Sequence, residues 1–247
     1  MFERAAARDI AARLQGPDRV VTVDVQTGGL ESLWGDLPSA TIHAKNFSLD
    51  ELPLFTEPKR STKGKLGVLN LQLSNFVLRG LRIESLSAKI PDCRFDFALA
   101  MKSRQIRLSR SGTGVGSVKI FEEDLARYIV HKFRDIKRCT VKARHGVVWV
   151  EGYGEFILAK TEFTVVAKIG VVDGTKLTLE KPKIFFDWVR AEPGAADALL
   201  KTLNPIIDLN EDLGLHGAIQ VTEVDARNGY LTASGKTTIP VRPPEEQ

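Results

Sequence analysis

A period-two alternation of apolar and polar residues restricts the fold of this chain more than any other feature. Leu69, Leu71 and Leu73 alternate with polar residues, and the pattern recurs between residues 66 and 110 and between residues 163 and 188. Successive side chains of a strand point to opposite faces, so each of these strands has one apolar and one polar face. This pattern is typical of a half-buried antiparallel sheet, because the strands of a parallel sheet are apolar on both faces.

Hairpin turns and further strands continue this pattern. The same alternation predicts a strand across Phe95, Phe97, Leu99 and Met101. Asp173-Gly174 favours a tight turn between two strands, and a second turn is expected at residues 144–146. Residues 143–152 match residues 226–235 at four positions, which both duplication and coincidence explain equally well. The chain is therefore predicted to be rich in antiparallel hairpins.

Three stretches have the apolar spacing of amphipathic helices. They cover residues 2–15, roughly residues 121–133, and a stretch that starts near Pro193 and ends by Asn204. The glycines of residues 112–116 predict a sharp turn that leads into the central helix. Helices and antiparallel strands that follow each other in this way indicate an α+β protein.

Length and composition predict a single folded unit. The chain has 247 residues, of which 43% are hydrophobic and 27% charged. We expect one domain over residues 1–240 and a tail rich in proline and glutamate over residues 241–247. The N-terminus lacks the apolar run of a signal peptide, and no run of about 18 apolar residues could span a bilayer. The sequence as given favours a cytoplasmic or peripheral membrane location, and a removed leader would instead place the protein in the periplasm or cell envelope.

No motif for catalysis or cofactor binding stands out. The glycines of residues 112–116 have the spacing GxGxG rather than GxGxxG, and no parallel βαβ unit surrounds them. The histidines are scattered, and Cys93 and Cys139 are far apart and predicted to be free thiols. The dense basic stripe with interleaved aromatics that binds nucleic acid is also absent from the sequence. We therefore expect no enzymatic activity, cofactor, metal or nucleic-acid partner, and nothing in the sequence identifies a protein partner.

The apolar faces of so many strands must be covered by something. Helices could fill a curled sheet completely, which would leave a β-rich structural or protein-interaction module with a plain core. They could also fill it in part, which would leave a groove that suits acyl chains. The net charge of +4 weakly favours an anionic partner such as a membrane surface.

Several longer runs of sequence resemble a known family. They follow the N-terminal amphipathic stretch and read Val21-Thr22-Val23-Asp24-Val25, Gly28-Gly29-Leu30, Leu66-Gly67-Val68-Leu69-Asn70-Leu71-Gln72-Leu73-Ser74-Asn75-Phe76, Gly116-Ser117-Val118-Lys119-Ile120, Glu122-Glu123-Asp124-Leu125, Leu203-Asn204-Pro205-Ile206-Ile207-Asp208-Leu209 and Asn228-Gly229-Tyr230-Leu231-Thr232-Ala233-Ser234-Gly235. This pattern, over about residues 20–240, resembles the bacterial LmeA-like phospholipid-binding family. The resemblance implies a TULIP-like fold, in which a strongly curled antiparallel β-sheet wraps a long amphipathic helix around an apolar groove. It also implies binding or transfer of phospholipid, in envelope maintenance, without catalysis.

Two sets of residues form the predicted site. The apolar faces of the strands and of the central helix would line a lipid groove with Leu69, Leu71, Leu73, Leu81, Ile83, Phe95, Phe97, Leu125, Ile129, Phe133, Phe163 and Val165. A basic loop broken by prolines would contact anionic headgroups through Lys59, Arg60, Lys63 and Lys65. A solvated tether is the plainer interpretation of that loop.

Overall fold

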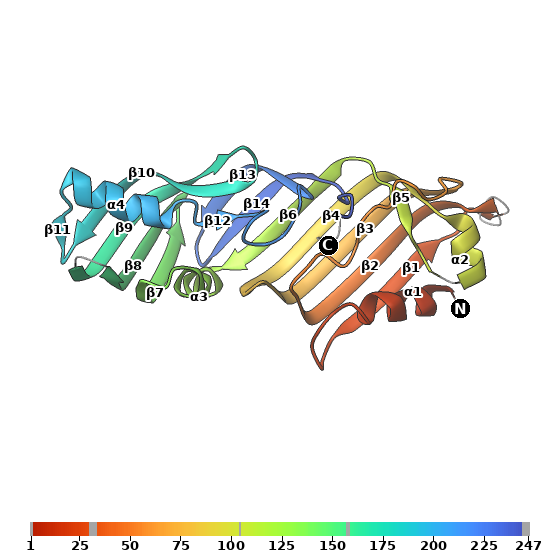
Figure 1. The fold of residues 1–247 in the computed structure, drawn as a ribbon, viewed down its shortest axis with the longest axis horizontal. Helices are drawn as coiled ribbons and strands as arrows, with labels where there is room; N and C mark the ends of the chain where they lie inside the picture. Colours follow the sequence, from red (N-terminus) through yellow and green to blue (C-terminus); the bar gives the residue numbers. More distant parts are fainter. Residues whose placement is uncertain (1, 30–33, 104, 157–158, 244–247) are drawn as a thin grey trace.

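The computed structural model describes residues 2–29, 34–103, 105–156 and 159–243, which form two β-sheets and four helices (Figure 1). The helices are α1 (Phe2–Ala11), α2 (Phe97–Ser103), α3 (Glu122–Lys132) and α4 (Pro193–Leu203). Sheet A has eight strands: β1 (Val20–Gln26), β2 (Asp36–Leu49), β3 (Gly64–Leu78), β4 (Leu81–Phe95), β5 (Leu108–Arg110), β6 (Gly114–Phe121), β13 (Ile219–Arg227) and β14 (Tyr230–Thr237). Sheet B has six: β7 (Ile136–Arg144), β8 (Val147–Phe156), β9 (Ala159–Val172), β10 (Lys176–Phe186), β11 (Val189–Arg190) and β12 (Ile207–Asp208).

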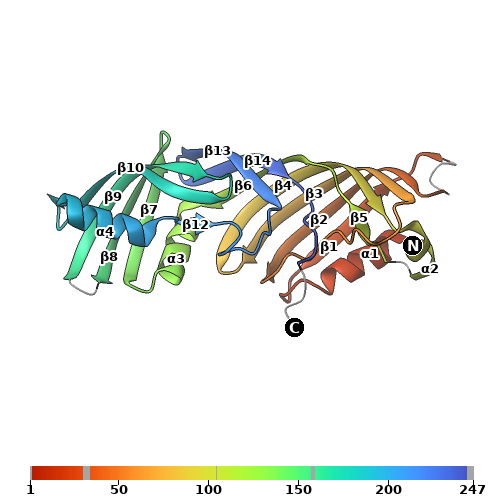
Figure 2. The same ribbon diagram turned by 45° about the horizontal axis from the view of Figure 1, so that its top comes forward.

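The two sheets lie end to end and give the molecule an elongated shape (Figures 1 and 2). The strand order is β1-β2-β3-β4-β6-β14-β13 in sheet A and β11-β10-β9-β8-β7 in sheet B. The α+β class is confirmed, and α1, α3 and α4 fall within the stretches predicted to be helical. Neither sheet is strongly curled, however, and the central helix α3 has only 11 residues, so the expected wrap around a long helix is not observed.

One strand pair departs from the predicted antiparallel arrangement. β2 and β3 run parallel, with Ala40 opposite Leu69 and Ala44 opposite Leu73, whereas the other strand pairs described are antiparallel. The reason is the connection over residues 50–63, which returns the chain to the end of sheet A where β2 began. Parallel neighbours need such a crossover, and here the Pro-broken loop provides it without a helix.

The strand predicted across Phe97, Leu99 and Met101 is wrong, because this stretch forms helix α2. Asp96 caps the helix: its side-chain oxygen accepts a hydrogen bond from the Leu99 N–H, at 3.0 Å. The residues that follow are rich in alanine, leucine, methionine and lysine, which favour helix. Local capping and helix propensity therefore override a short alternation that fits both structures.

The sharp turn predicted for the glycines before α3 is also wrong, because Gly114 and Gly116 belong to strand β6. A Cβ atom on Gly114 would lie 1.9 Å from the carbonyl oxygen of Lys89 on the neighbouring strand β4. The glycine therefore serves the close approach of two strands rather than a turn or a phosphate-binding loop.

Helix α3 sits where the two sheets meet (Figure 1). Its first residue, Glu122, accepts hydrogen bonds through Oε1 from the N–H of Ala143 in sheet B and of Gly229 in the β13–β14 turn of sheet A. The two hairpins with similar sequences meet here as well, since the Gly146 N–H donates to the Ala226 carbonyl oxygen at 2.9 Å. The junction is thus held by backbone groups that converge on one carboxylate.

Both cysteines are free thiols, as predicted, and burial raises the pKa of Cys93 to about 11 and that of Cys139 to about 12. At pH 8, which is below both pKa values, roughly one thiol in a thousand or fewer is then the reactive thiolate, against about a quarter for a free cysteine. We expect 5,5′-dithiobis(2-nitrobenzoate) to modify the native protein more than a hundredfold more slowly than the guanidinium-unfolded protein. The native rate should rise about tenfold per pH unit between pH 8 and 10, and rapid modification at pH 8 would contradict the burial of these thiols.

Candidate functional site

The predicted groove residues do not share one surface. Two hydrophobic clusters divide them: a junction cluster around α3 and sheet B, and an end cluster under the far end of sheet A. The junction cluster buries Leu81, Ile83, Leu125, Ile129, Phe163 and Val165, and the end cluster buries Leu69 and Phe95. Partly exposed members are Leu71, Leu73, Phe97 and Phe133. Most of the predicted set therefore belongs to closed packing in this structure, and among its strand residues only Leu71 and Leu73, in the middle of β3, stay partly open.

Leu73 belongs to a continuous apolar row across sheet A. Cross-strand partners form the row from one edge of the sheet to the other: Val21, Ala44, Leu73, Leu86, Val118, Ala233 and Val224. Ala44 is buried, whereas the other members are only partly buried. At about 4.8 Å between neighbouring strands, the apolar row is about 29 Å long. Ile42 and Leu71, also partly buried partners, lie beside it on the same face.

The apolar row is partly open because it lies between the two clusters. Leu73 packs against the junction cluster, Leu71 against the end cluster, and Leu86 against both. Residues 54–57 and 239–242 cross near the end cluster, where the Thr56 N–H donates to the Pro240 carbonyl oxygen at 2.8 Å. Val241, which was expected in the tail, forms a bridge with Thr56, and residues 244–247 of that tail lie outside the described residues. Neither cluster therefore seals the middle of this face.

Two asparagines mark one side of the apolar row. Asn46 on β2 and Asn75 on β3 have positive φ angles of 59° and 48°, and the Asn75 side-chain amide donates to the Asn46 side-chain oxygen at 2.8 Å. After these asparagines the alternation of inward and outward side chains shifts by one residue. Phe47 and Phe76 therefore point inward, and their rings stack with centroids 5.0 Å apart. This stacked pair belongs to the junction cluster and limits the apolar row on that side.

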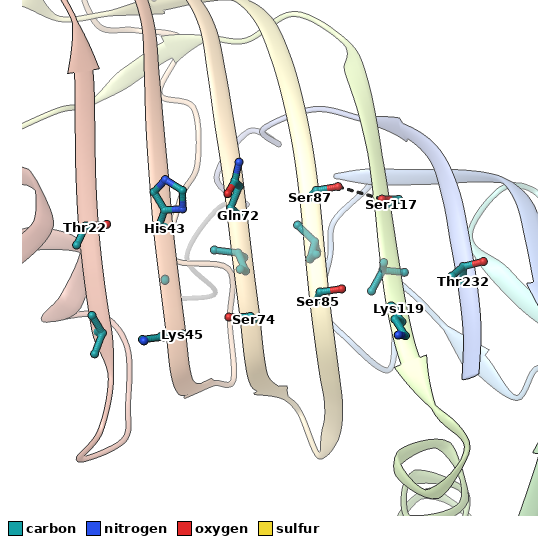
Figure 3. Close-up of a pocket in the computed structure, with 15 residues that line it drawn as sticks. Thr22, His43, Lys45, Gln72, Ser74, Ser85, Ser87, Ser117, Lys119 and Thr232 are labelled. Atoms are coloured by element: carbon teal, nitrogen blue, oxygen red, sulfur yellow. Dashed lines mark hydrogen bonds between the residues drawn. The ribbon is translucent and has the colours of Figure 1, made fainter. Parts of the chain in front are cut away.

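The opposite face of the same strands carries polar side chains around a hollow of about 630 Å³. Polar residues of two cross-strand rows line it, and Figure 3 shows them on β1, β2, β3, β4, β6 and β14: Thr22, His43, Gln72, Ser87 and Ser117 in one, and Lys45, Ser74, Ser85, Lys119 and Thr232 in the other. Val20 also lines the hollow, as do Ala44, Leu73, Leu86 and Val118 of the apolar row, which alternate with the polar residues along their strands. The Oγ atoms of Ser87 and Ser117 lie 2.9 Å apart. A smaller hollow of about 320 Å³ adjoins it and shares Gln72, Ser87 and Ser117.

The central strands of this polar face are basic. Over β2, β3, β4, β6 and β14, the two rows and the next row along carry Lys45, Lys89, Lys119 and Lys236 but no aspartate or glutamate. The ammonium nitrogen of Lys119 lies 4.2 Å from the centroid of the Tyr230 ring. Acidic residues of these rows lie on the edge strands: Asp24 on β1, 3.8 Å from His43, and Glu223 and Asp225 on β13, opposite Ser234 and Thr232. Lysines among hydroxyl groups suit an anionic or strongly polar ligand rather than an acyl chain.

The predicted headgroup residues gather at the end of sheet A that lies farthest from α3. Lys59 and Lys63 are exposed, Arg60 pairs with Glu57, and the Lys65 ammonium lies 3.4 Å from Asp36. The register places Arg94 directly opposite Lys65, and Arg110 directly opposite Arg94. Three cations from β3, β4 and β5 thus stand side by side in one row, a grouping that sequence spacing alone did not reveal.

The titratable groups beside α3 are engaged in structural contacts. Lys132 donates to the carbonyl oxygens of Pro205 and Ile206, at 2.9 and 3.1 Å, and to the carboxylate of Asp212. Burial and the nearby Asp212 raise the pKa of Tyr128 well above its usual range. These contacts fasten the chain after α4 to the central helix. Within the described ranges, no group of three or more histidine, cysteine, aspartate or glutamate residues could hold a metal ion.

Together these features define a class of protein: an α+β fold of two open sheets, with a partly covered apolar row on one face of sheet A and a basic polar hollow on the other. The sequence model of the LmeA-like phospholipid-binding family matches residues 62–236. The chain therefore belongs to the LmeA-like phospholipid-binding family, as the sequence resemblance predicted. No curated protein and no solved structure matches the chain significantly. None of the described helices has the length and apolar character needed to cross a membrane.

Proposed function

We propose that this protein binds a phospholipid without catalysis and that an acyl chain lies along the apolar row of sheet A. The observation that carries the proposal is a row of apolar side chains that runs across the whole sheet and is sealed by neither cluster. Its members Val21, Leu86, Val118 and Ala233 were not among the predicted groove residues. Within a phospholipid-binding family, a partly covered apolar surface of this kind is the surface on which a lipid tail would gain most.

The dimensions of the apolar row suit a lipid tail. The hydrocarbon core of a bilayer is about 30 Å thick, so one tail reaches about 15 Å, well within the length of the row. Each buried methylene contributes about 0.8 kcal/mol, so ten methylenes would supply about 8 kcal/mol before the cost of ordering the chain. The basic loop residues Lys59, Arg60, Lys63 and Lys65 would meet anionic headgroups at the membrane where the lipid is collected.

Lipid binding on an open sheet would also allow lipid transfer. A lipid held on an open sheet face can be loaded at one membrane and released at another, which amounts to lipid transfer. We propose that such transfer serves the maintenance of a cell envelope, and that the protein acts as a peripheral membrane protein. The competing hypothesis is a structural or protein-interaction module, which is favoured by the closed packing of residues such as Leu81, Phe163 and Val165.

Lipid extraction separates these hypotheses. We expect native mass spectrometry of the purified full-length chain, before and after incubation with phosphatidylglycerol vesicles, to show about one bound phospholipid per chain. Organic extraction of the same sample should recover that lipid intact, because no catalysis is proposed. If neither sample carries lipid, the protein is a module with a filled core; if the vesicle lipid is recovered as cleaved products, the non-catalytic part of the proposal fails.

A further inference from the structure

The two ends of the elongated molecule each expose a tryptophan. The Trp34 side chain, just before β2, is 80% exposed, and that of Trp188, between β10 and β11, is 82% exposed. Met101 on α2 is also 69% exposed. Tryptophan favours the interface between water and lipid, so an exposed tryptophan is a candidate membrane contact where other features of the same surface agree.

Trp34 and Met101 lie at the same end of sheet A. A Cβ atom on Gly35, the residue after Trp34, would lie 2.6 Å from the ring of Phe97, which is the first residue of α2. The Gly35 carbonyl oxygen also accepts a hydrogen bond from the Lys65 N–H at 2.8 Å, at the start of β3. Figures 1 and 2 both show α2 beside the start of β2 at this end of the molecule.

This end is also the basic end. Lys65, Arg94 and Arg110 are direct cross-strand neighbours, and like charges in such positions repel each other. Neither Arg94 nor Arg110 forms an ion pair with any residue in the described part of the chain, and Asp36 lies only at the Lys65 side of the row. Three aligned cations with one carboxylate beside them favour binding to an external anionic surface, because its negative charge would relieve the repulsion among the cations.

The Trp188 end, as far as the structure describes it, has no comparable row of aligned cations. Two nearby cations are paired within the protein, Arg138 with Glu162 and Lys160 with Glu155 at 3.2 Å, and the exposed Arg190 lies opposite Phe185 rather than another cation. The carboxylate of Asp187, next to Trp188, accepts a hydrogen bond from Thr161 at 3.1 Å. Equal tryptophan exposure thus comes with different electrostatics at the two ends, which makes each end a control for the other.

We propose that the Trp34 end docks on the surface of an anionic membrane. Trp34 and Met101 enter the interface, while Lys65, Arg94 and Arg110 face the lipid phosphates. This docking rests on the proposed lipid binding and specifies which end of sheet A meets the membrane. Lys65, one of the predicted headgroup residues, would act there together with Arg94 of β4 and Arg110 of β5. The Trp188 end remains in solution.

Vesicle co-sedimentation of the full chain tests this assignment. With vesicles of phosphatidylcholine and phosphatidylglycerol at 7:3, we expect Trp34→Ala to weaken binding about tenfold, since 1.4 kcal/mol corresponds to a factor of ten. The double variant Arg94→Gln/Arg110→Gln should weaken it roughly 25-fold, because each basic residue near an anionic surface contributes about a factor of five. The matched controls Trp188→Ala and Arg190→Gln, at the opposite end, should bind like the unchanged protein.

The outcomes separate docking from lipid binding. With pure phosphatidylcholine vesicles, all variants should bind weakly, and Arg94→Gln/Arg110→Gln should bind like the unchanged protein, since the charged lipid is missing. If Trp34→Ala sediments like the unchanged protein, or if Trp188→Ala loses as much binding, the assignment of this end is overturned. The apolar row is tested separately, by loading the variants with phospholipid from detergent micelles and measuring the phospholipid recovered by extraction. A loss of docking with unchanged lipid content leaves the proposed function intact.

Discussion

Leu73→Lys is expected to abolish the retention of phospholipid. The change places an ammonium group in the centre of the apolar row, where Leu73 lies between Ala44 and Leu86. A tail on that surface would lose contact with about four methylenes, or roughly 3 kcal/mol, which corresponds to a loss of more than a hundredfold in affinity. The desolvation of the new charge would add to this loss. Native mass spectrometry after loading with phosphatidylglycerol measures the effect as the fraction of chains with bound lipid.

The neighbouring residue provides a control for charge. Ser74→Lys adds the same ammonium group one position along β3, on the exposed polar face, and should leave lipid content unchanged. Leu73→Trp fills the row without charge and should also reduce lipid retention, which covers the case in which Leu73→Lys unfolds the protein. Thermal unfolding of all three variants identifies any such failure to fold. Normal lipid content in a folded Leu73→Lys or Leu73→Trp protein would show that the tail does not lie on the apolar row.

Local patterns in the sequence predict the strands and most of the helices. The alternation of leucine with polar residues in β3 correctly assigns an apolar and a polar face, and it places Leu71 and Leu73 on the partly open side. Alternation describes one strand at a time, however, and the apolar row exists only through the register of neighbouring strands. Residues such as Val21 and Val118, which are far apart in sequence, join Leu73 in one row through that register.

Two asparagines with positive φ angles interrupt the alternation within single strands. Asn46 and Asn75 adopt positive φ angles that change which side chains face inward, so a strict alternation through β2 and β3 misplaces Phe47 and Phe76. The sequence carries a signal for this, since an Asn-Phe pair occurs in both strands. The basic row has no comparable signal, because Lys65, Arg94 and Arg110 meet only through β3–β4 and β4–β5 pairing.

Glu122→Ala is expected to cause a large loss of stability, because this carboxylate joins the two sheets. Its Oε1 atom accepts from the Ala143 N–H of β7 and, at 3.2 Å, from the Gly229 N–H of sheet A. Ala143 is 0% exposed, so water cannot readily replace the lost acceptor there. Hydrogen bonds to charged groups contribute about 1.5–3 kcal/mol each, and an unpaired buried donor costs about 1–3 kcal/mol. We expect the free energy of unfolding to fall by about 3 kcal/mol, which lowers the melting temperature by roughly 6–12 °C.

The next residue of α3 separates this inter-sheet contact from the effect of charge at a helix start. Glu123 lies in the same first turn and is exposed, so Glu123→Ala removes an equal charge from the helix dipole and should cost under about 1 kcal/mol. Glu122→Gln keeps an acceptor oxygen without the charge and should fall between the two alanine variants, since charge-assisted hydrogen bonds are about twice as strong as neutral ones. Calorimetry of the three variants ranks them directly. Equal losses for Glu122→Ala and Glu123→Ala would mean that the sheets are held together by the packing of Leu125, Ile129 and their neighbours rather than by this carboxylate.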